Sequence, residues 1–244
     1  MTDKKGKLFL FPHTLTKKGA DKDAFLTPAL IEAVGEIDGI IAESMTGGLS
    51  FMKMFQTKKA PHNMPICLFN KKTPDEDINF VLEPLLKGET WGFVADAGLP
   101  CVADPGAKLV RKASLKKLEV KAFYGPSSIF LSLMLSGFNG QNFAFNGYLA
   151  SNKENMEKEL RVLENRSKNF KSTQIFIEAP YRNTALLESC IKVLDKKTAL
   201  CMACDLTTPE EVVISKKVCE WEGIDLSEFH KRPAIFLIDY HSFR

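Results

Sequence analysis

The stretch Ala95–Gly106, which reads ADAGLPCVADPG, decides how we expect this chain to fold. It follows the apolar run Trp91–Val94 and precedes a helical pattern that begins near Lys108, so it is typical of the turn between a buried strand and a helix. In parallel α/β sheets, ligands bind at the carboxyl ends of the strands, where such turns lie. The stretch therefore predicts a parallel sheet with a binding site at this turn.

Two residues of this stretch carry the interpretation. Gly98 allows backbone angles that are closed to other residues, and it lets a ligand approach the main chain. Asp104 can cap the next helix, with Pro105 at its first position, where a missing N–H costs nothing. An ordinary strand-to-helix connection would use an Asp-Pro-Gly in the same way, but the longer segment is more specific than that.

The first half of the chain alternates short apolar runs with amphipathic segments. Helical patterns begin at Thr27-Pro28, near Gly48 and after the start signal Thr73–Glu76. Such alternation favours parallel strands that are crossed over by helices on both faces of the sheet. The expected strands are Leu8–Phe11, Gly39–Ala42, Ile66–Phe69, Trp91–Ala95 and Val120–Tyr124.

Strands outnumber helices in the second half, which favours a smaller, mixed sheet. A charged helix is expected over Lys153–Asn165, a polar stretch over Arg166–Ser172 and another helix near Thr184–Leu194. The expected strands are Gln174–Ile177, Ala199–Cys204, Val212–Ser215 and Ala234–Tyr240. The predicted fold class is therefore α/β with two domains, residues 1–148 and 149–244.

Composition bounds the class of protein. The chain has 244 residues and a net charge of only +3, so its overall charge does not by itself favour nucleic acid. Lysines do cluster early in the sequence, and they are either solvated surface or a docking site for a polyanion. We expect a soluble cytoplasmic protein, because no signal peptide and no apolar stretch of membrane-spanning length is present.

Known catalytic motifs with strong spacing are absent from the sequence. There is no phosphate-binding Gly-x-x-x-x-Gly-Lys-Ser/Thr loop, no Gly-x-Gly-x-x-Gly, no Gly-x-Ser-x-Gly and no His-Glu-x-x-His. The spacing of the six cysteines predicts no metal site, and we expect all six to be core thiols. The histidines, of which His13 is the first, are expected at the surface.

Four turns rich in small residues remain. They offer main-chain groups and short hydroxyls, which suit a neutral or zwitterionic cofactor better than a polyphosphate. The turns are Asp96–Gly106, Gly125–Ser128, Glu178–Asn183 and Leu206–Glu210.

The order of these turns resembles that of the tetrapyrrole methylase superfamily of S-adenosylmethionine-dependent methyltransferases. Within it, the chain most resembles the bacterial ribosomal RNA small-subunit cytidine 2′-O-methyltransferases, which carry Ser-Asp-Ala-Gly-Thr-Pro-x-x-x-Asp-Pro-Gly in place of Ala95–Gly106. Their Gly-Pro-Cys/Ser turn is matched by Gly125–Ser127, their Tyr-Glu-Ser-x-His-Arg by Ile177–Arg182, and their Glu-Leu-Thr-Lys by Asp205–Thr208. The match runs in order along nearly the whole chain.

The resemblance implies a homodimer whose chains bind S-adenosylmethionine in the cleft between two α/β domains. Through the resemblance we expect the cofactor to contact Ala97, Gly98, Leu99, Val102, Ser127, Ser128, Glu178, Thr207 and Ala234. No metal is implied.

The chain departs from the family pattern in three places. The family's Pro-Thr-Pro-Ile-Gly-Asn-Leu after the first strand is replaced by Pro12–Gly19, which reads PHTLTKKG. Its Ala-Glu-Asp-Thr-Arg is replaced by Ala42–Thr46, without the arginine, and Leu99 replaces a threonine. The cofactor half therefore matches better than the substrate half.

These features predict a methyltransferase that acts on ribosomal RNA or the small ribosomal subunit. If the acceptor is a ribose hydroxyl, a side chain must take its proton, and the candidate catalytic residues are Asp104 and Glu43. Two alternatives stay open: methylation of a tetrapyrrole or other small molecule, and a relative that binds S-adenosylmethionine or RNA without catalysis. Steep salt dependence of substrate binding would separate RNA from a tetrapyrrole.

Overall fold

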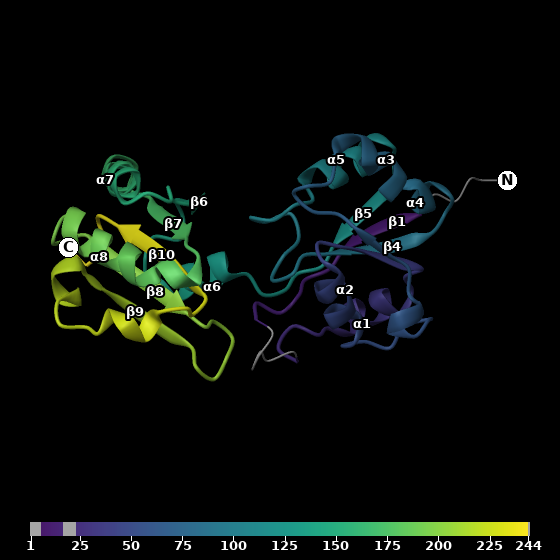
Figure 1. Ribbon diagram of the computed structural model, residues 1–244, viewed down its shortest axis with the longest axis horizontal. Helices are drawn as coiled ribbons and strands as arrows, with labels where there is room; N and C mark the ends of the chain where they lie inside the picture. The colour runs from purple at the N-terminus through teal and green to yellow at the C-terminus, as the bar shows by residue number, and fades with distance from the viewer. Residues whose placement is uncertain (1–5, 17–22, 244) are drawn as a thin grey trace. The chain divides into compact units, whose positions relative to one another are not determined.

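The computed structural model describes residues 6–16 and 23–243. The chain forms two compact units, Met1–Ser127 and Ser128–Arg244, here called the N-terminal and the C-terminal unit (Figure 1). Each unit contains one five-stranded sheet. The predicted α/β fold class, with a parallel sheet followed by a mixed sheet, is confirmed.

The sheet of the N-terminal unit is entirely parallel, with strand order β3-β2-β4-β1-β5. Neighbouring residues of one strand point to opposite faces, so Leu8 and Phe9 enter different cores, as do Ile40 and Ile41. Burial on both faces explains why the inner strands β2 and β4 are almost wholly apolar, whereas the edge strand β5 carries Glu119 and Lys121. The strands are β1 (Lys7–Leu10), β2 (Gly39–Ala42), β3 (Ile66–Leu68), β4 (Thr90–Val94) and β5 (Glu119–Ala122).

Helices cover both faces of this sheet, as expected (Figure 1). One face carries α1 (Pro28–Gly35) and α2 (Met45–Met52), and the other carries α3 (Ile78–Val81), α4 (Glu83–Leu86) and α5 (Ala107–Leu115). The helix that was predicted after Thr73–Glu76 is divided into α3 and α4. Pro84 is the reason, since it has no N–H to continue the hydrogen-bond ladder of α3.

Helix α5 corrects one prediction about Asp104. The helix begins at Ala107 with Gly106 as its N-cap, and no side chain caps it, so Asp104 is not a capping residue and Pro105 is not its first position. Gly106 has φ +136°, and a Cβ there would lie 2.4 Å from the Phe93 ring and 2.5 Å from Cys101 Sγ. The chain therefore needs glycine at 106 to turn into α5.

The sheet of the C-terminal unit is mixed, with order β6-β7-β10-β8-β9. Strands β6 and β7 are parallel, and the other pairs are antiparallel. Helices α7 and α8 pack on it around Leu160, Leu186, Phe176 and Phe236. The elements are α6 (Ser128–Ser136), β6 (Phe143–Tyr148), α7 (Lys153–Phe170), β7 (Thr173–Ile177), α8 (Asn183–Val193), β8 (Ala199–Cys204), β9 (Val212–Lys217) and β10 (Ala234–Asp239).

Two expectations about this unit differ from the structure. Helix α7 continues to Phe170, through most of the predicted polar stretch, because Ser167 is buried there and its Oγ accepts the Tyr240 N–H at 2.9 Å. The units meet at Ser127–Ser128, whereas the sequence favoured a boundary at 148–149. The reason is that β6 pairs with β7 and α6 packs on β8, β9 and β10.

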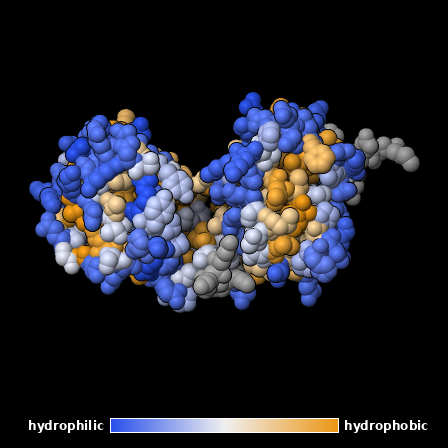
Figure 2. All heavy atoms as spheres, viewed as in Figure 1, coloured by the Kyte–Doolittle hydropathy of each residue, from blue (hydrophilic) through white to orange (hydrophobic). Residues whose placement is uncertain are grey.

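Smaller features complete the description. Of the six cysteines expected in the core, Cys190, Cys201 and Cys204 are buried, Cys67 and Cys101 are half-buried, and Cys219 is exposed. Across residues 6–16 and 23–243, no helix is both long and apolar enough to cross a membrane. The same part of the chain holds no group of His, Cys, Asp and Glu side chains that could bind a metal ion. Figure 2 shows hydrophobic atoms gathered in the middle of the visible face of the N-terminal unit, bordered by hydrophilic ones.

Candidate functional site

The carboxyl ends of the parallel strands bring the predicted turns of the N-terminal unit together. The loop after β1 is joined to the turn after β4, since the His13 N–H donates to Gly98 O at 2.8 Å and the Gly98 N–H donates to Thr14 O at 3.3 Å. A Cβ on Gly98, whose φ is +65°, would lie 3.2 Å from the Leu15 side chain and 3.6 Å from Pro126 O. Three turns thus converge on Gly98.

A second connection joins the end of β2 to the end of β4. The Ser44 hydroxyl donates to Asp96 Oδ1 at 2.6 Å and also accepts the Gly47 N–H at 2.9 Å, so it caps α2. The Asp96 N–H donates to Glu43 Oε2 at 3.3 Å. The carboxylates of Glu43 and Asp96 are therefore held next to each other on the same side of the unit as Gly98.

Asp104 lies beside these two carboxylates. Burial, together with the nearby charges of Glu43 and Asp96, raises the pKa of Asp104 to about 6, and the charge of Lys71 opposes this rise. Asp104 accepts no hydrogen bond from any residue in 6–16 or 23–243. The two candidate catalytic residues, Glu43 and Asp104, are thus brought close enough to interact, and Asp104 has a pKa near neutrality.

The predicted cofactor residues in and near the turn after β4 are all uncharged. Ala97 and Val102 are exposed, Leu99 is half-buried, and Gly98 is buried with both of its main-chain groups hydrogen-bonded. Ser127, the last residue of the N-terminal unit, is buried, and Ser128, the first residue of the C-terminal unit and of α6, is half-buried. No lysine or arginine lies in Ala95–Gly106. Such a surface suits a cationic sulfonium nucleoside better than a phosphate.

The predicted residues of the C-terminal unit also lie at one end of the strands of their sheet. Glu178 follows β7, Thr207 follows β8, and Ala234 begins β10, which is antiparallel to both. The Lys231 N–H donates to Pro180 O and the Asp205 N–H donates to Pro233 O, both at 2.9 Å. These bonds fasten the three loops together.

Glu178 is engaged within this unit. Its side chain is buried, lies 2.9 Å from the Arg182 guanidinium and accepts the Ala179 N–H at 2.7 Å. Arg182 also donates to Ala150 O at 3.0 Å. The carboxylate of Glu178 therefore shapes the loop, and what this loop can offer to a ligand is mainly its backbone.

The turn after β8 is held by Arg232. The Arg232 Nε donates to Asp205 Oδ2 at 2.5 Å, and the guanidinium also donates to Glu210 O at 2.7 Å. One side chain therefore hydrogen-bonds to both ends of the turn. Glu211 accepts the Thr207 N–H at 2.9 Å. Thr207 is half-buried in the middle of this turn.

Unusual backbone conformations mark the same loops, and nothing in the sequence predicted them. Positive φ is uncommon for residues other than glycine, and it tends to cluster at ligand sites. Cys101 and Ala103 adopt it in the turn after β4, Asp205 and Thr207 adopt it after β8, and Lys231 adopts it before β10. The surrounding structure therefore holds these residues in backbone conformations that are unfavourable for residues other than glycine.

Two predictions about the loop after β1 have different outcomes. His13 was expected at the surface, but it is buried against Phe51 and contacts Thr14 through its ring. The altered turn Pro12–Gly19 is described only as far as Thr16, so its last three residues lie outside the described residues.

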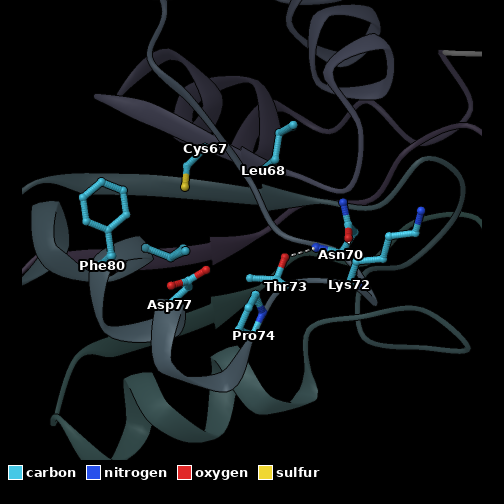
Figure 3. A pocket seen from close by; sticks show the side chains of 9 residues that line it. Cys67, Leu68, Asn70, Lys72, Thr73, Pro74, Asp77 and Phe80 are labelled. Carbon is cyan, nitrogen blue, oxygen red and sulfur yellow. Dashed lines mark hydrogen bonds between the residues drawn. The ribbon is translucent and has the colours of Figure 1, made fainter.

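Sequence reasoning missed a groove of about 490 Å³ beside the edge strand β3. Figure 3 shows the Phe80 ring at one end of it, the Asp77 carboxylate between Phe80 and Thr73, and Lys72 at the other end. Asn70, also in the lining, donates from Nδ2 to Glu43 O at 3.4 Å. The lining of the groove therefore contacts the main chain of Glu43.

Comparison with known proteins identifies relatives along most of the chain, although no family model matches it. Ribosomal RNA small subunit methyltransferase I of Bacillus subtilis is 30% identical over 223 residues, which cover 89% of this chain and 70% of that protein. The Thermotoga maritima protein of the same name is 27% identical, over 86% of this chain and 88% of its own length.

Solved structures share the fold. The methyltransferase CobJ superposes with a TM-score of 0.64 at 15% identity, over 98% of this chain and 95% of its own. Uroporphyrin-III-C-methyltransferase of Thermus thermophilus gives a TM-score of 0.55 at 16% identity, over 96% and 92%.

Proposed function

The chain belongs to the ribosomal RNA small subunit methyltransferase I family, and from this membership we propose that it methylates ribosomal RNA of the small subunit with S-adenosylmethionine as the methyl donor. It is a methyltransferase, with the fold of the tetrapyrrole methylases. One observation carries the proposal: a relative with this activity in its name is 30% identical to the chain across 89% of its length. The loops described above supply the groups that such a reaction needs.

S-adenosylmethionine would be held by the two sets of loops. On the N-terminal unit, the apolar side chains of Ala97, Leu99 and Val102 would pack against it, with Gly98 positioning the turn. Ser127, the last residue of that unit, and Ser128, the first residue of the C-terminal unit, would donate hydroxyls. On the C-terminal unit, Glu178, Thr207 and Ala234 lie on loops that would contact it through main-chain groups. The negative charges of Asp96 and Asp104 suit a cationic ligand. When bound, the cofactor supplies an electrophilic methyl group on a sulfonium.

The protein's own part in the reaction is to hold the acceptor in line and to remove a proton. Held geometry lowers the barrier because the two reacting molecules need not find each other in solution. We propose a ribose hydroxyl as the acceptor and Asp104 as the general base. A pKa of about 6 leaves Asp104 ionised at neutral pH and still able to take a proton. Glu43 is the second carboxylate, and it keeps that pKa raised.

The assembly and the place of action follow from the same proposal. We propose a homodimer that acts in the cytoplasm on the small ribosomal subunit or its RNA. A tetrapyrrole or another small acceptor stays the second candidate, because CobJ and uroporphyrin-III-C-methyltransferase have the same fold as this chain. It ranks second because their sequence identity is only 15% and 16%. The arginine that the resemblance would place at position 46 is absent here, because Thr46 stands there.

The test is a tritiated-methyl assay with the purified protein and three acceptors: small ribosomal subunits, free small-subunit RNA, and a tetrapyrrole. Calorimetry with S-adenosylmethionine is run beside it. We expect cofactor binding and label in RNA, with binding that weakens steeply as salt increases, since phosphate contacts release counterions. Label in the tetrapyrrole alone would contradict the proposed substrate. Cofactor binding without any label would indicate the non-catalytic relative.

A further inference from the structure

We propose that the groove beside β3 binds an unpaired nucleotide of the RNA substrate, with the base against Phe80 and the adjacent phosphate near Lys72. The proposal rests on the proposed function, because it assigns a second contact for the same RNA. It adds a binding site on the N-terminal unit that the cofactor loops do not contain.

Phe80 is the first reason. Its side chain is 71% exposed although α3 is anchored by the buried Ile78 and Val81, so packing does not explain an aromatic residue there. The ring lines the groove of about 490 Å³ and also a neighbouring hollow of about 310 Å³. An accessible ring between two hollows is a platform for stacking, and stacking is how proteins hold single-stranded nucleic acid without reading its sequence.

Lys72 is the second reason. Lys58, Lys87 and Lys108 of the same unit form ion pairs with acidic side chains at 2.7 to 3.1 Å. Lys72 forms no ion pair with any residue in 6–16 or 23–243, and its ammonium is available to a phosphate. A cation at one end of a groove and an aromatic ring at the other match the two parts of a nucleotide.

The loop that carries Lys72 is rigid, which favours a prepared site over a mobile surface. The Asn70 N–H donates to Thr73 Oγ1 at 2.9 Å, and the Thr73 N–H donates to Asn70 O at 3.0 Å. The Lys72 N–H donates to Asn70 Oδ1 at 2.9 Å. The main chain of the loop is thus fixed before any ligand arrives, and less freedom is lost on binding.

The groove also leads to the carboxylates. Asn70 is hydrogen-bonded to the main chain of Glu43, and the Lys71 charge lowers the pKa of Asp104, so Lys71 lies near that carboxyl group. All of these residues belong to the N-terminal unit. An RNA strand with one nucleotide in the groove would therefore continue directly towards the candidate base.

The first measurement is the affinity for RNA, read from the fluorescence anisotropy of a labelled oligouridylate with the full chain. Phe80→Ala should weaken binding by roughly 10-fold, because base–aromatic stacking contributes that much on alanine substitution. Phe80→Trp should restore it. Phe170→Ala is the matched control, since Phe170 is 69% exposed at the end of α7 and lines neither hollow, and it should bind as the wild type does.

The second measurement separates the two contacts. Lys72→Gln should lower the slope of log affinity against log salt by about 0.7, the value for one phosphate contact on a single strand, whereas Phe80→Ala should leave that slope unchanged. Lys158→Gln is the control, because Lys158 is paired with Glu154 at 2.6 Å on α7. In methylation assays, Phe80→Ala should raise KM for RNA with kcat nearly unchanged.

These outcomes keep the groove and the proposed function apart. Unchanged RNA affinity, salt slope and KM in both variants of an active enzyme would overturn the groove assignment and leave methylation intact; the edge of β3 would then be free for a protein contact. A wild-type protein that neither binds RNA nor methylates it would overturn the proposed function itself, and with it this inference.

Discussion

Asp104 is the side chain for which the role expected from the sequence and the position observed in the structure differ most. Its Asp-Pro-Gly context is typical of a helix cap, yet Gly106 takes that position and no side chain caps α5. A half-buried carboxyl group that has a raised pKa and accepts no hydrogen bond from the described part of the chain is typical of functional sites. The loss of the capping role therefore strengthens the proposed catalytic one.

Removing the Asp104 carboxylate should abolish most of the activity. Asp104→Asn keeps the shape but cannot accept a proton, so kcat should fall by about 10²–10⁴, with S-adenosylmethionine binding retained in calorimetry. In the wild type, kcat/KM should decline below pH about 6, where the carboxyl group becomes protonated. The control is Glu222→Gln, an exposed residue paired with Lys196, which should leave the pH profile unchanged. Full activity in Asp104→Asn would exclude this residue as the base.

The same substitution should make the protein more stable at neutral pH. The pKa of Asp104 rises from 3.8 to about 6 on folding, so the folded state disfavours the charged form and is penalised wherever the unfolded chain ionises. The penalty is absent below pH 3.8 and complete above pH about 6. The carboxyl group is only half-buried, so solvent screens part of this penalty, and Asp104→Asn should gain about 1–2 kcal/mol at pH 8 and nothing at pH 3.5, measured by urea unfolding. A gain that does not depend on pH would contradict the burial of this charge.

Loops, more than helices or strands, distinguish the candidate site. In each sheet, the strands bring their loops to one end. Hydrogen bonds within and between these loops then hold the residues that have positive φ. The turn after β8 is the clearest case, because the Arg232 guanidinium bridges a side chain at one end and a carbonyl at the other. The planar guanidinium of arginine has several N–H donors and can bond to both groups at once, whereas the single ammonium of a lysine does not have this geometry.

Arg232 should therefore be needed for the turn and for cofactor binding. Arg232→Ala should lower the free energy of unfolding by about 1.5–3 kcal/mol, the usual cost of losing hydrogen bonds to charged groups, and Arg232→Lys should fall in between. Both should weaken S-adenosylmethionine binding in calorimetry. The comparison is Lys196→Ala, which removes an exposed ion pair and should cost at most about 1 kcal/mol. Equal losses in the Arg232 and Lys196 variants would show that the turn does not depend on the bridge.

Across the complete chain, each unit has its own core and its own share of the proposed cofactor residues. If S-adenosylmethionine is held by both, hydrogen exchange should slow on cofactor addition in residues 95–106 and 125–128 and also in residues 178–182 and 205–211. Exchange in the last turns of α7, which carry none of the proposed cofactor residues, serves as the internal reference. Protection limited to one unit would contradict a site made by both.

Much of the fold could be predicted because strand burial leaves a direct mark on the amino-acid pattern. The β2 and β8 bounds match the expected Gly39–Ala42 and Ala199–Cys204, since strands buried on both faces are apolar at every position. Strand β6 was missed because its residues Phe143–Tyr148 are partly exposed and carry no continuous apolar signal. Helix α7 was predicted too short because its last turns are polar on the surface and are fixed by a single buried serine.

The amino-acid order alone was enough to establish the α/β class, the parallel first sheet and the glycine-rich turn after β4, because these depend on local periodicity and on backbone angles that few residues allow. Contacts between distant segments decided the rest. The pKa of Asp104 depends first on its burial and then on the charges of Glu43 and Lys71. The shape of the turn after β8 depends on Arg232, and the groove beside β3 depends on how α3 packs against an edge strand. None of these can be read along the chain, because burial and charge act through space and not along the sequence.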